Sequence, residues 1–224
     1  MVSLDCAALT TRQINQRLEA LANGAQITIR NPHGRHNLAV GLDQAVDITV
    51  DGHGGYYYGG MNKQARIVIN GNVGPGVAEN MMSGRIHVHG HASAAAGASA
   101  HGGLLIIDQD ASIRCGISLK GGNIVVGGSV GNMCGFIAQL GTIVVCGNAA
   151  AGLGDSLYEA VVYVRGQISN LGADAQQEEM TPPDEDKVAR LLDEAGFKHD
   201  PKKFKRVASA KTLYHFDAGS GQMY

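Results

Sequence analysis

The sequence lacks several features that would point to common classes of binding or membrane protein. Its formal net charge is only −2, so no basic field predicts binding to nucleic acid. It has no run of 18 or more apolar residues, so no membrane span is expected. The first residues also lack the basic cluster and long apolar stretch of a signal peptide. These absences leave the cytoplasm as the expected location.

Residue groupings that carry catalysis are missing as well. The four cysteines (Cys6, Cys115, Cys134 and Cys146) form no C-x-x-C pair, so a zinc ribbon is not indicated. The spacing of Cys115 and Cys134 would permit a disulfide, but a reducing compartment favours two buried thiols. No Ser-His-Asp, paired-carboxylate or activated-cysteine arrangement stands out. We therefore expect no catalytic residue, no bound cofactor and no metal ion in this chain.

What the sequence does contain is glycine, 32 of 224 residues, within a repeat of 19 residues that runs from 46 to 166. Segments of this length align without insertion when they begin at Val46, Ala65, Gly84, Gly103, Gly122, Gly141 and Ala160. Positions three and five of each segment are Ile, Val or Leu, beginning with Ile48 and Val50. Position seven is glycine in all segments but the fourth: Gly52, Gly71, Gly90, Gly128, Gly147 and Gly166. A fixed period of this size must be explained first.

The period favours coils of short strands. Apolar residues two apart point to one face of a strand, and β-branched side chains suit that setting. A glycine two places later supplies a corner, through a positive φ or a close backbone approach. Nineteen residues are too few for a βαβ unit, which needs roughly 30. A β-sandwich would vary its loop lengths, and a left-handed hexapeptide β-helix would carry an aliphatic residue in every six. We predict an all-β fold, a right-handed parallel β-helix of about seven coils.

The two ends of the chain depart from the repeat. Residues 1–45 contain a short amphipathic helix that begins at Thr10-Thr11 and would cap the first coil, followed by a strand over 26–30. The β-helix is predicted to occupy 46–173. Residues 174–224 are more charged and are predicted to form a linker (176–185), a helix (184–195) and an arm laid across another surface. Fifty such residues could not bury a core of their own.

Three alternating histidines (His87, His89 and His91) are the strongest candidates for metal ligands, because imidazoles at i and i+2 on a strand can share an ion. They align, however, with polar residues in the neighbouring coils. His89 aligns with Asp51, Asn70 and Asp108, and His91 aligns with His53, Asn72 and Asp110. Such columns are typical of solvent-facing strand positions, so no metal site is predicted here.

Position four of the repeat should point outward, yet several of its residues are apolar. The apolar stripe comprises Val68, Ile106, Val125 and Val144. Soluble monomers avoid contiguous apolar patches of this kind, so either a partner or the C-terminal arm should cover it. We take these four residues, with Tyr214 and Phe216 of the arm, as the candidate subunit interface.

The pattern G-x-I-x-V-x-G followed by a glycine-punctuated turn, as in 84–103 and 122–147, resembles the GXGXG repeat domain. That domain is the C-terminal β-helix of the glutamate synthase large subunit. The likeness covers about residues 10 to 172 and includes Asp51-Gly52-His53-Gly54-Gly55-Tyr56 leading to Arg66-Ile67-Val68-Ile69. Because the chain stands alone rather than fused to other domains, it is similar to the separate GXGXG subunit of N-methylglutamate synthase.

The resemblance implies a non-catalytic subunit of an enzyme complex that makes N-methylglutamate from glutamate and methylamine. It would hold an amidotransferase-like subunit and an FMN-binding synthase-like subunit together in a hetero-oligomer. The FMN, with an iron–sulfur cluster as a further candidate, would lie in a partner. Two alternatives stay open: the subunit of formylmethanofuran dehydrogenase that carries the same repeats, and a stand-alone β-helix that binds a ligand or a surface.

Overall fold

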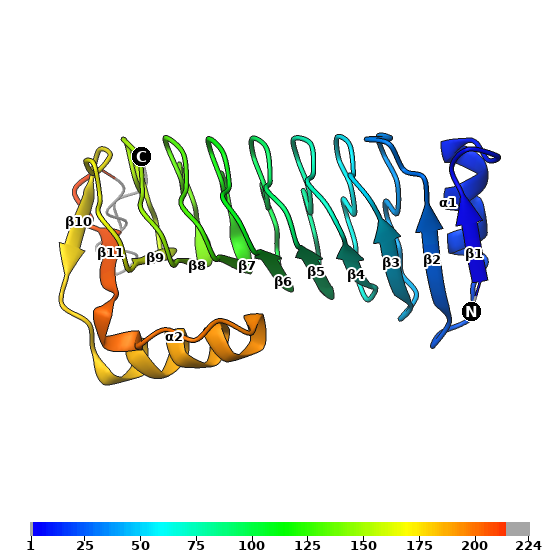
Figure 1. Ribbon diagram of the computed structural model, residues 1–224. Helices are drawn as coiled ribbons and strands as arrows, with labels where there is room; N and C mark the ends of the chain where they lie inside the picture. Colours follow the sequence, from blue (N-terminus) through cyan, green and yellow to red (C-terminus); the bar gives the residue numbers. More distant parts are fainter. Residues whose placement is uncertain (1, 214–224) are drawn as a thin grey trace, which may run out of the picture.

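The computed structural model describes residues 2–213, and within this range the chain winds into a parallel β-helix (Figure 1). One sheet runs the whole length of the molecule, with its strands in the order β1 to β9, then β11 and β10. The strands are β1 (Val2–Asp5), β2 (Gln26–Arg30), β3 (Asp47–Asp51), β4 (Arg66–Ile69), β5 (Arg85–Val88), β6 (Leu104–Ile107), β7 (Lys120–Val126), β8 (Leu140–Val145), β9 (Val161–Val164), β10 (Ala175–Glu178) and β11 (Lys205–Ser209). The helices are α1 (Thr11–Glu19), α2 (Pro182–Ala195) and the one-turn 3₁₀ helix Pro201–Lys203. The predicted fold is confirmed.

The 19-residue repeat sets the register from β3 to β9. Ile48 pairs with Ile67, Ile67 with Ile86, and the same column continues through to Val162. Every side chain at positions three and five of these coils is at most 1% exposed. The step from β2 to β3 is longer, because Ile27 pairs with Ile48. This is the two-residue offset that the sequence predicts. The aliphatic columns therefore fill the bore of the β-helix as its core.

The repeat also orders polar side chains along one outer corner. At position eight, a side chain of one coil accepts a hydrogen bond from the backbone N–H of the same position in the next coil. Asn72 N–H donates to His53 Nδ1 at 2.9 Å, and His91 N–H donates to Asn72 Oδ1 at 2.9 Å. The series continues through Asp110, Ser129, Asn148 and Gln167. This polar ladder satisfies backbone donors that the corner would otherwise leave unpaired.

The corner glycines at position seven are required by close approach between coils. Gly52 alone among them has a positive φ, of 134°. A Cβ on Gly71 would lie 2.8 Å from the Gly52 backbone, and one on Gly147 would lie 2.6 Å from the Gly128 backbone; Gly90, Gly128 and Gly166 are similarly crowded. Positive φ is found instead at position fourteen, from Gly59 at 64° to Gly154 at 68°. The sequence predicted either a positive φ or a close backbone approach at these glycines, and close approach to the preceding coil is the reason that applies generally.

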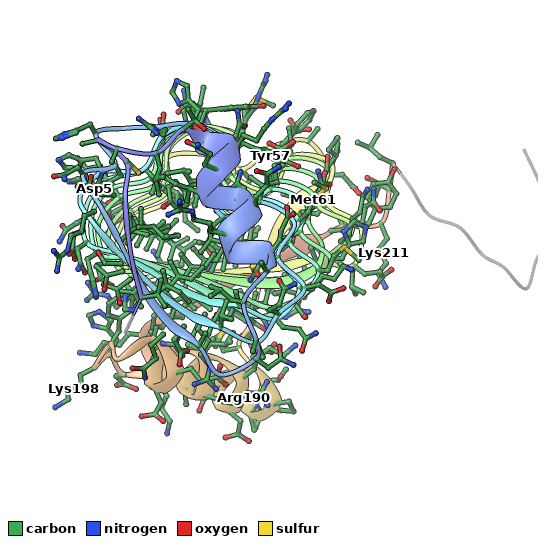
Figure 2. All side chains as sticks on the ribbon, turned by 90° about the vertical axis from the view of Figure 1, so that its right-hand side faces the viewer. Asp5, Tyr57, Met61, Arg190, Lys198 and Lys211 are labelled. Atoms are coloured by element: carbon green, nitrogen blue, oxygen red, sulfur yellow. The ribbon has the colours of Figure 1, made fainter. Side chains whose placement is uncertain are left out.

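Each end of the β-helix carries elements outside the repeat. At the N-terminal end, α1 lies across the bore, as the view along the axis shows (Figure 2). Its side chains Ile14 and Leu18 are fully buried. Thr10 and Gln13 form a capping box at its start. The strand β1, which the sequence did not predict, pairs in parallel with β2. At the other end β11 pairs antiparallel with β9, and β10 pairs antiparallel with β11. The two edge strands of the sheet are therefore β1 and β10.

Residues 174–213 pack on the β-helix rather than forming a separate arm. The predicted helix is confirmed, although it begins at Pro182; it ends at Gly196, whose φ is 79°. Within the predicted linker (176–185), residues 176–178 belong to the strand β10 and residues 182–185 to α2, so the linker prediction was wrong at these residues. No helix among residues 2–213 is long and apolar enough to cross a membrane.

Candidate functional site

The outward face of the sheet is divided into two halves by α2, which runs beneath β6 to β9 and leaves the face of β2 to β5 open (Figure 1). In the covered half, the position-four residues are Ile106, Val125, Val144 and Tyr163, each at most 1% exposed. They pack against Val188, Leu191, Leu192 and Ala195 of α2 and against Phe204. In the open half, the corresponding residues Thr49, Val68 and His87 are partly exposed. We call these the covered face and the open face.

Specific contacts fix α2 in this place. The Asp184 carboxylate, in the first turn of α2, accepts a hydrogen bond from the Tyr163 hydroxyl at 2.5 Å and one from Arg206 Nε at 3.3 Å. At the far end of the helix, the Arg85 guanidinium donates to the Glu194 carbonyl at 2.7 Å. Burial and the hydrogen bond with Asp184 together raise the pKa of Tyr163. The helix is therefore held by polar contacts at both ends and by apolar packing between them.

This arrangement corrects part of the predicted subunit interface. The sequence left two covers open for the apolar stripe, and for Ile106, Val125 and Val144 the cover is α2 of the same chain. These three residues are not available to a partner while α2 is in place. Val68 lies on the open face and stays a candidate. Tyr214 and Phe216 lie outside the described residues.

The open face forms a groove of about 960 Å³ between the strands and the C-terminal end of α2. Outward residues of β2 to β5 line it, together with Glu194 of α2. Among the lining residues are Thr28, Thr49, Val68 and His87 at the centre of the strands and Lys63, Arg66 and Arg85 toward their beginnings. Lys63 Nζ lies 2.8 Å from the Asp43 carboxylate. The groove thus combines charged, polar and apolar side chains and is more polar than the covered face.

At the border between the two faces, His87 and His89, which are two residues apart, both contact the carboxylate of Asp108 in the next coil. Nε2 of His87 lies 2.6 Å from Oδ1 of Asp108, and Nδ1 of His89 lies 2.6 Å from Oδ2. The centres of the two imidazole rings are 4.3 Å apart. Burial alone would raise the pKa of Asp108, but the hydrogen bonds with His89 and His87 outweigh it and lower that pKa. Among the described residues, this is the group of three whose ligand atoms could surround one metal ion.

The third histidine of the predicted stripe is not part of this group. His91 belongs to the polar ladder, where its Nδ1 accepts from the backbone of Asp110 at 3.2 Å. Column alignment revealed that His89 stacks on Asp108, but it could not reveal that His87 reaches the same carboxylate diagonally. That contact crosses both one coil and two repeat positions.

None of the described cysteines has the environment of a nucleophile. All four are free and buried. A hydrogen bond with Cys115, together with burial, raises the pKa of the Cys134 thiol. Burial raises the pKa of Cys146 to about 11 and also raises that of Cys6. Since the thiolate is the reactive species, these four thiols are expected to be unreactive.

Comparison with known proteins shows a strong similarity over the full length of the chain. The chain is 53% identical over 228 residues to Protein GlxC of Rhizobium meliloti (strain 1021), and the match covers 100% of both chains. No family model matches the chain.

Proposed function

Because the chain belongs to the family of Protein GlxC, to which it aligns over its full length, we propose that it is a non-catalytic scaffold subunit of a glutamate-synthase-like, FMN-dependent complex. In its finer form, the proposal names N-methylglutamate synthase, which converts glutamate and methylamine to N-methylglutamate and ammonia. The chain would hold an amidotransferase-like subunit and an FMN synthase-like subunit together. The repeat pattern that resembles the GXGXG domain of glutamate synthases supports this form.

The division of the outward sheet face is the observation that carries the scaffold proposal. The molecule covers the apolar half with its own helix and leaves the polar half, with its groove, open along four strands. A stacked β-helix is also a stiff body, since each coil is hydrogen-bonded to the next along the whole sheet. Such a body suits the spacing of two larger subunits.

We propose that the flavin lies in a partner subunit, and the packed bore of this β-helix supports this. Aliphatic columns at positions three and five, each residue at most 1% exposed, occupy the interior. A closely packed interior of this kind leaves few voids larger than a water molecule. An iron–sulfur cluster, if the complex has one, would also belong to a partner, since all four cysteines of this chain are buried and two of them, Cys115 and Cys134, form a hydrogen bond with each other.

Co-purification tests the proposal directly. An affinity tag on the native chain, in the organism that makes it, should recover an amidotransferase-like and an FMN-binding synthase-like protein, identified by mass spectrometry. The recovered complex should show flavin absorbance and form N-methylglutamate, and the isolated chain should do neither. Recovery of molybdopterin-dependent partners would instead support a formylmethanofuran dehydrogenase subunit. A stable chain without partners, or turnover by the isolated chain, would contradict the scaffold proposal.

Val68→Arg sharpens this test. The substitution places a charge and a long side chain in the groove without touching the packing beneath α2, so the chain should fold as before. We expect weaker recovery of at least one partner with an unchanged melting temperature. Ser112→Arg, at an exposed residue that does not line the groove, is the matched control and should recover partners as the unaltered chain does.

A further inference from the structure

The group formed by His87, His89 and Asp108 has the composition of a metal-binding site. Two imidazole nitrogens and one carboxylate converge from β5 and from the residues that directly follow β5 and β6, and their ligand atoms all lie within 4.8 Å of one another. The side chains of His87, His89 and Asp108 are 17%, 44% and 24% exposed. They are held by the sheet behind them but can be reached from solvent in front.

We propose that His87, His89 and Asp108 bind one divalent transition-metal ion of the zinc type. Nε2 of His87, Nδ1 of His89 and the carboxylate of Asp108 would be its three protein ligands, and solvent would supply the fourth. Imidazole with carboxylate is a ligand set that suits Zn²⁺ and its first-row neighbours, whereas Mg²⁺ and Ca²⁺ prefer oxygen alone. Three protein ligands with one open position is also the pattern of zinc sites that exchange a bound water or a ligand.

The geometry requires little rearrangement to accept the ion. In a tetrahedral site with metal–ligand distances of about 2.1 Å, neighbouring ligand atoms lie about 3.4 Å apart. The two nitrogen–oxygen separations of 2.6 Å would have to widen by less than about 1 Å, which side-chain rotation can supply. Each neutral imidazole would carry its proton on the nitrogen that does not face the metal.

Paired hydrogen bonds without a metal are the alternative, and metal titration decides between the two. The repeat shows that the group is more than another outer polar column. If the group were only one more outer polar column, its contacts would follow the 19-residue step, as those of the polar ladder do. The contact of His87 with Asp108 spans 21 residues and brings an outward strand residue to a carboxylate that His89 already contacts. Two imidazoles thus converge on one carboxylate.

The location gives the ion a defined setting. His87 lines the groove of the open face, so a metal here would stand at the edge of that groove, where α2 ends. It would join two adjacent coils of the β-helix through side chains. The inference does not depend on the proposed function, because it concerns binding of the ion by this chain alone.

Titration of the full-length, chelator-stripped chain with Zn²⁺ by calorimetry, and with Co²⁺ by visible absorption, tests the site. We expect one ion per chain, ligand-field bands of a four-coordinate Co²⁺ site, and a higher melting temperature in the presence of Zn²⁺, because the ion binds the folded state. Even altering residues that only support metal ligands costs 10–100-fold in affinity, so loss of a ligand itself should weaken binding by at least about 100-fold.

The repeat supplies variants that are expected to fold. His89→Asn introduces asparagine, which already occupies the equivalent position of the preceding coil as Asn70. His87→Val introduces valine, which occupies the equivalent position as Val68 in the preceding coil and as Val125 farther along. His91→Asn, matching Asn72, is the control outside the group and should leave zinc affinity unchanged within about twofold. Circular dichroism without metal checks that each variant melts cooperatively.

Three results would overturn the proposal: a chain that binds neither ion, equal affinity in His89→Asn and the unaltered chain, or an equal loss of affinity in the His91→Asn control. If one ligand variant fails to fold, the other still decides the question. Activity of the complex is not needed for any of these readouts.

Discussion

The covered and open faces belong to one continuous sheet and share one repeat, but they differ in the residues at position four. Position four is Ile106, Val125 and Val144 where α2 lies on the sheet, and Thr49, Val68 and His87 where it does not. The interior columns do not change between the halves, so the fold does not require the difference. It follows that position four of a β-helix of this kind reports what lies on its outer surface.

A buried charge at position four should distinguish the two faces most strongly. Val125→Asp would place a carboxylate beneath α2 with no partner, and we expect it to cost about 4 kcal/mol or more in unfolding free energy. Thr49→Asp, the equivalent change on the open face, should cost no more than about 1 kcal/mol, because that side chain reaches solvent. Urea denaturation of both variants measures the difference. Equal costs would mean that α2 does not cover the sheet in solution.

The corner glycines test how closely adjacent coils approach one another. A Cβ at Gly128 would lie 2.8 Å from the carbonyl carbon of Gln109 and 2.3 Å from Oδ1 of Asp110. We therefore expect Gly128→Val to cost about 2–3 kcal/mol through crowding. Gln109→Ala, at the one position-seven site that already has a side chain, is the control and should be near neutral. An unchanged denaturation midpoint for Gly128→Val would show that the coils can separate at this corner.

Anchoring of α2 is expected to have a smaller effect. Tyr163→Phe removes the hydroxyl that donates to Asp184 and leaves the apolar packing intact. We expect a loss of about 1–2 kcal/mol, because a charged acceptor loses a hydrogen bond. Arg190→Ala is the control, since Arg190 points away from the β-helix (Figure 2) and its side chain is 66% exposed. If both variants melt alike, the contact with Asp184 does not hold the helix.

The smallest expected effect is the pH dependence of the C-terminal contacts. Hydrogen bonds from Thr212, and then from Ser209, lower the pKa of Asp174 to about 2. The pKa of Asp174 in the unfolded chain is higher, about 3.9. The carboxylate therefore stabilises the folded state fully above that pH, and this stabilisation is lost as pH falls toward 2. Asp174→Asn should therefore lower the melting temperature at neutral pH and have little effect near pH ~2. A difference that does not vary with pH would exclude the carboxylate as its cause.

The repeat made most of the fold predictable, and its interruption explains what was missed. Residues 46–166 predict their own register because each side chain faces the equivalent side chain one coil away. The strand β11 lies outside the repeat, so no equivalent residues 19 positions away indicate its register. Its residues 205–206 belong to a basic cluster, which hid the fully buried Val207 beside them. The strand β1 is likewise a single copy outside the repeat.

The candidate sites were less predictable than the fold for a related reason. Alignment in columns shows which residues stack, but His87 meets Asp108 across columns, and that contact depends on side-chain reach. The identity of the cover over Ile106, Val125 and Val144 depended on the path of the chain after residue 174. A sequence repeat predicts neither this contact nor this cover.

The central claim, that the open face docks a partner and the covered face does not, is tested most directly by lysine footprinting of the co-purified complex. Lys63 lines the groove, whereas Lys187 and Lys198 are exposed on α2 and just beyond it. Acetylation followed by mass spectrometry should label all three lysines in the isolated chain. In the complex, we expect Lys63 to be protected and Lys187 and Lys198 to remain labelled. Unchanged labelling of Lys63, with protection at Lys187 and Lys198 instead, would contradict the account.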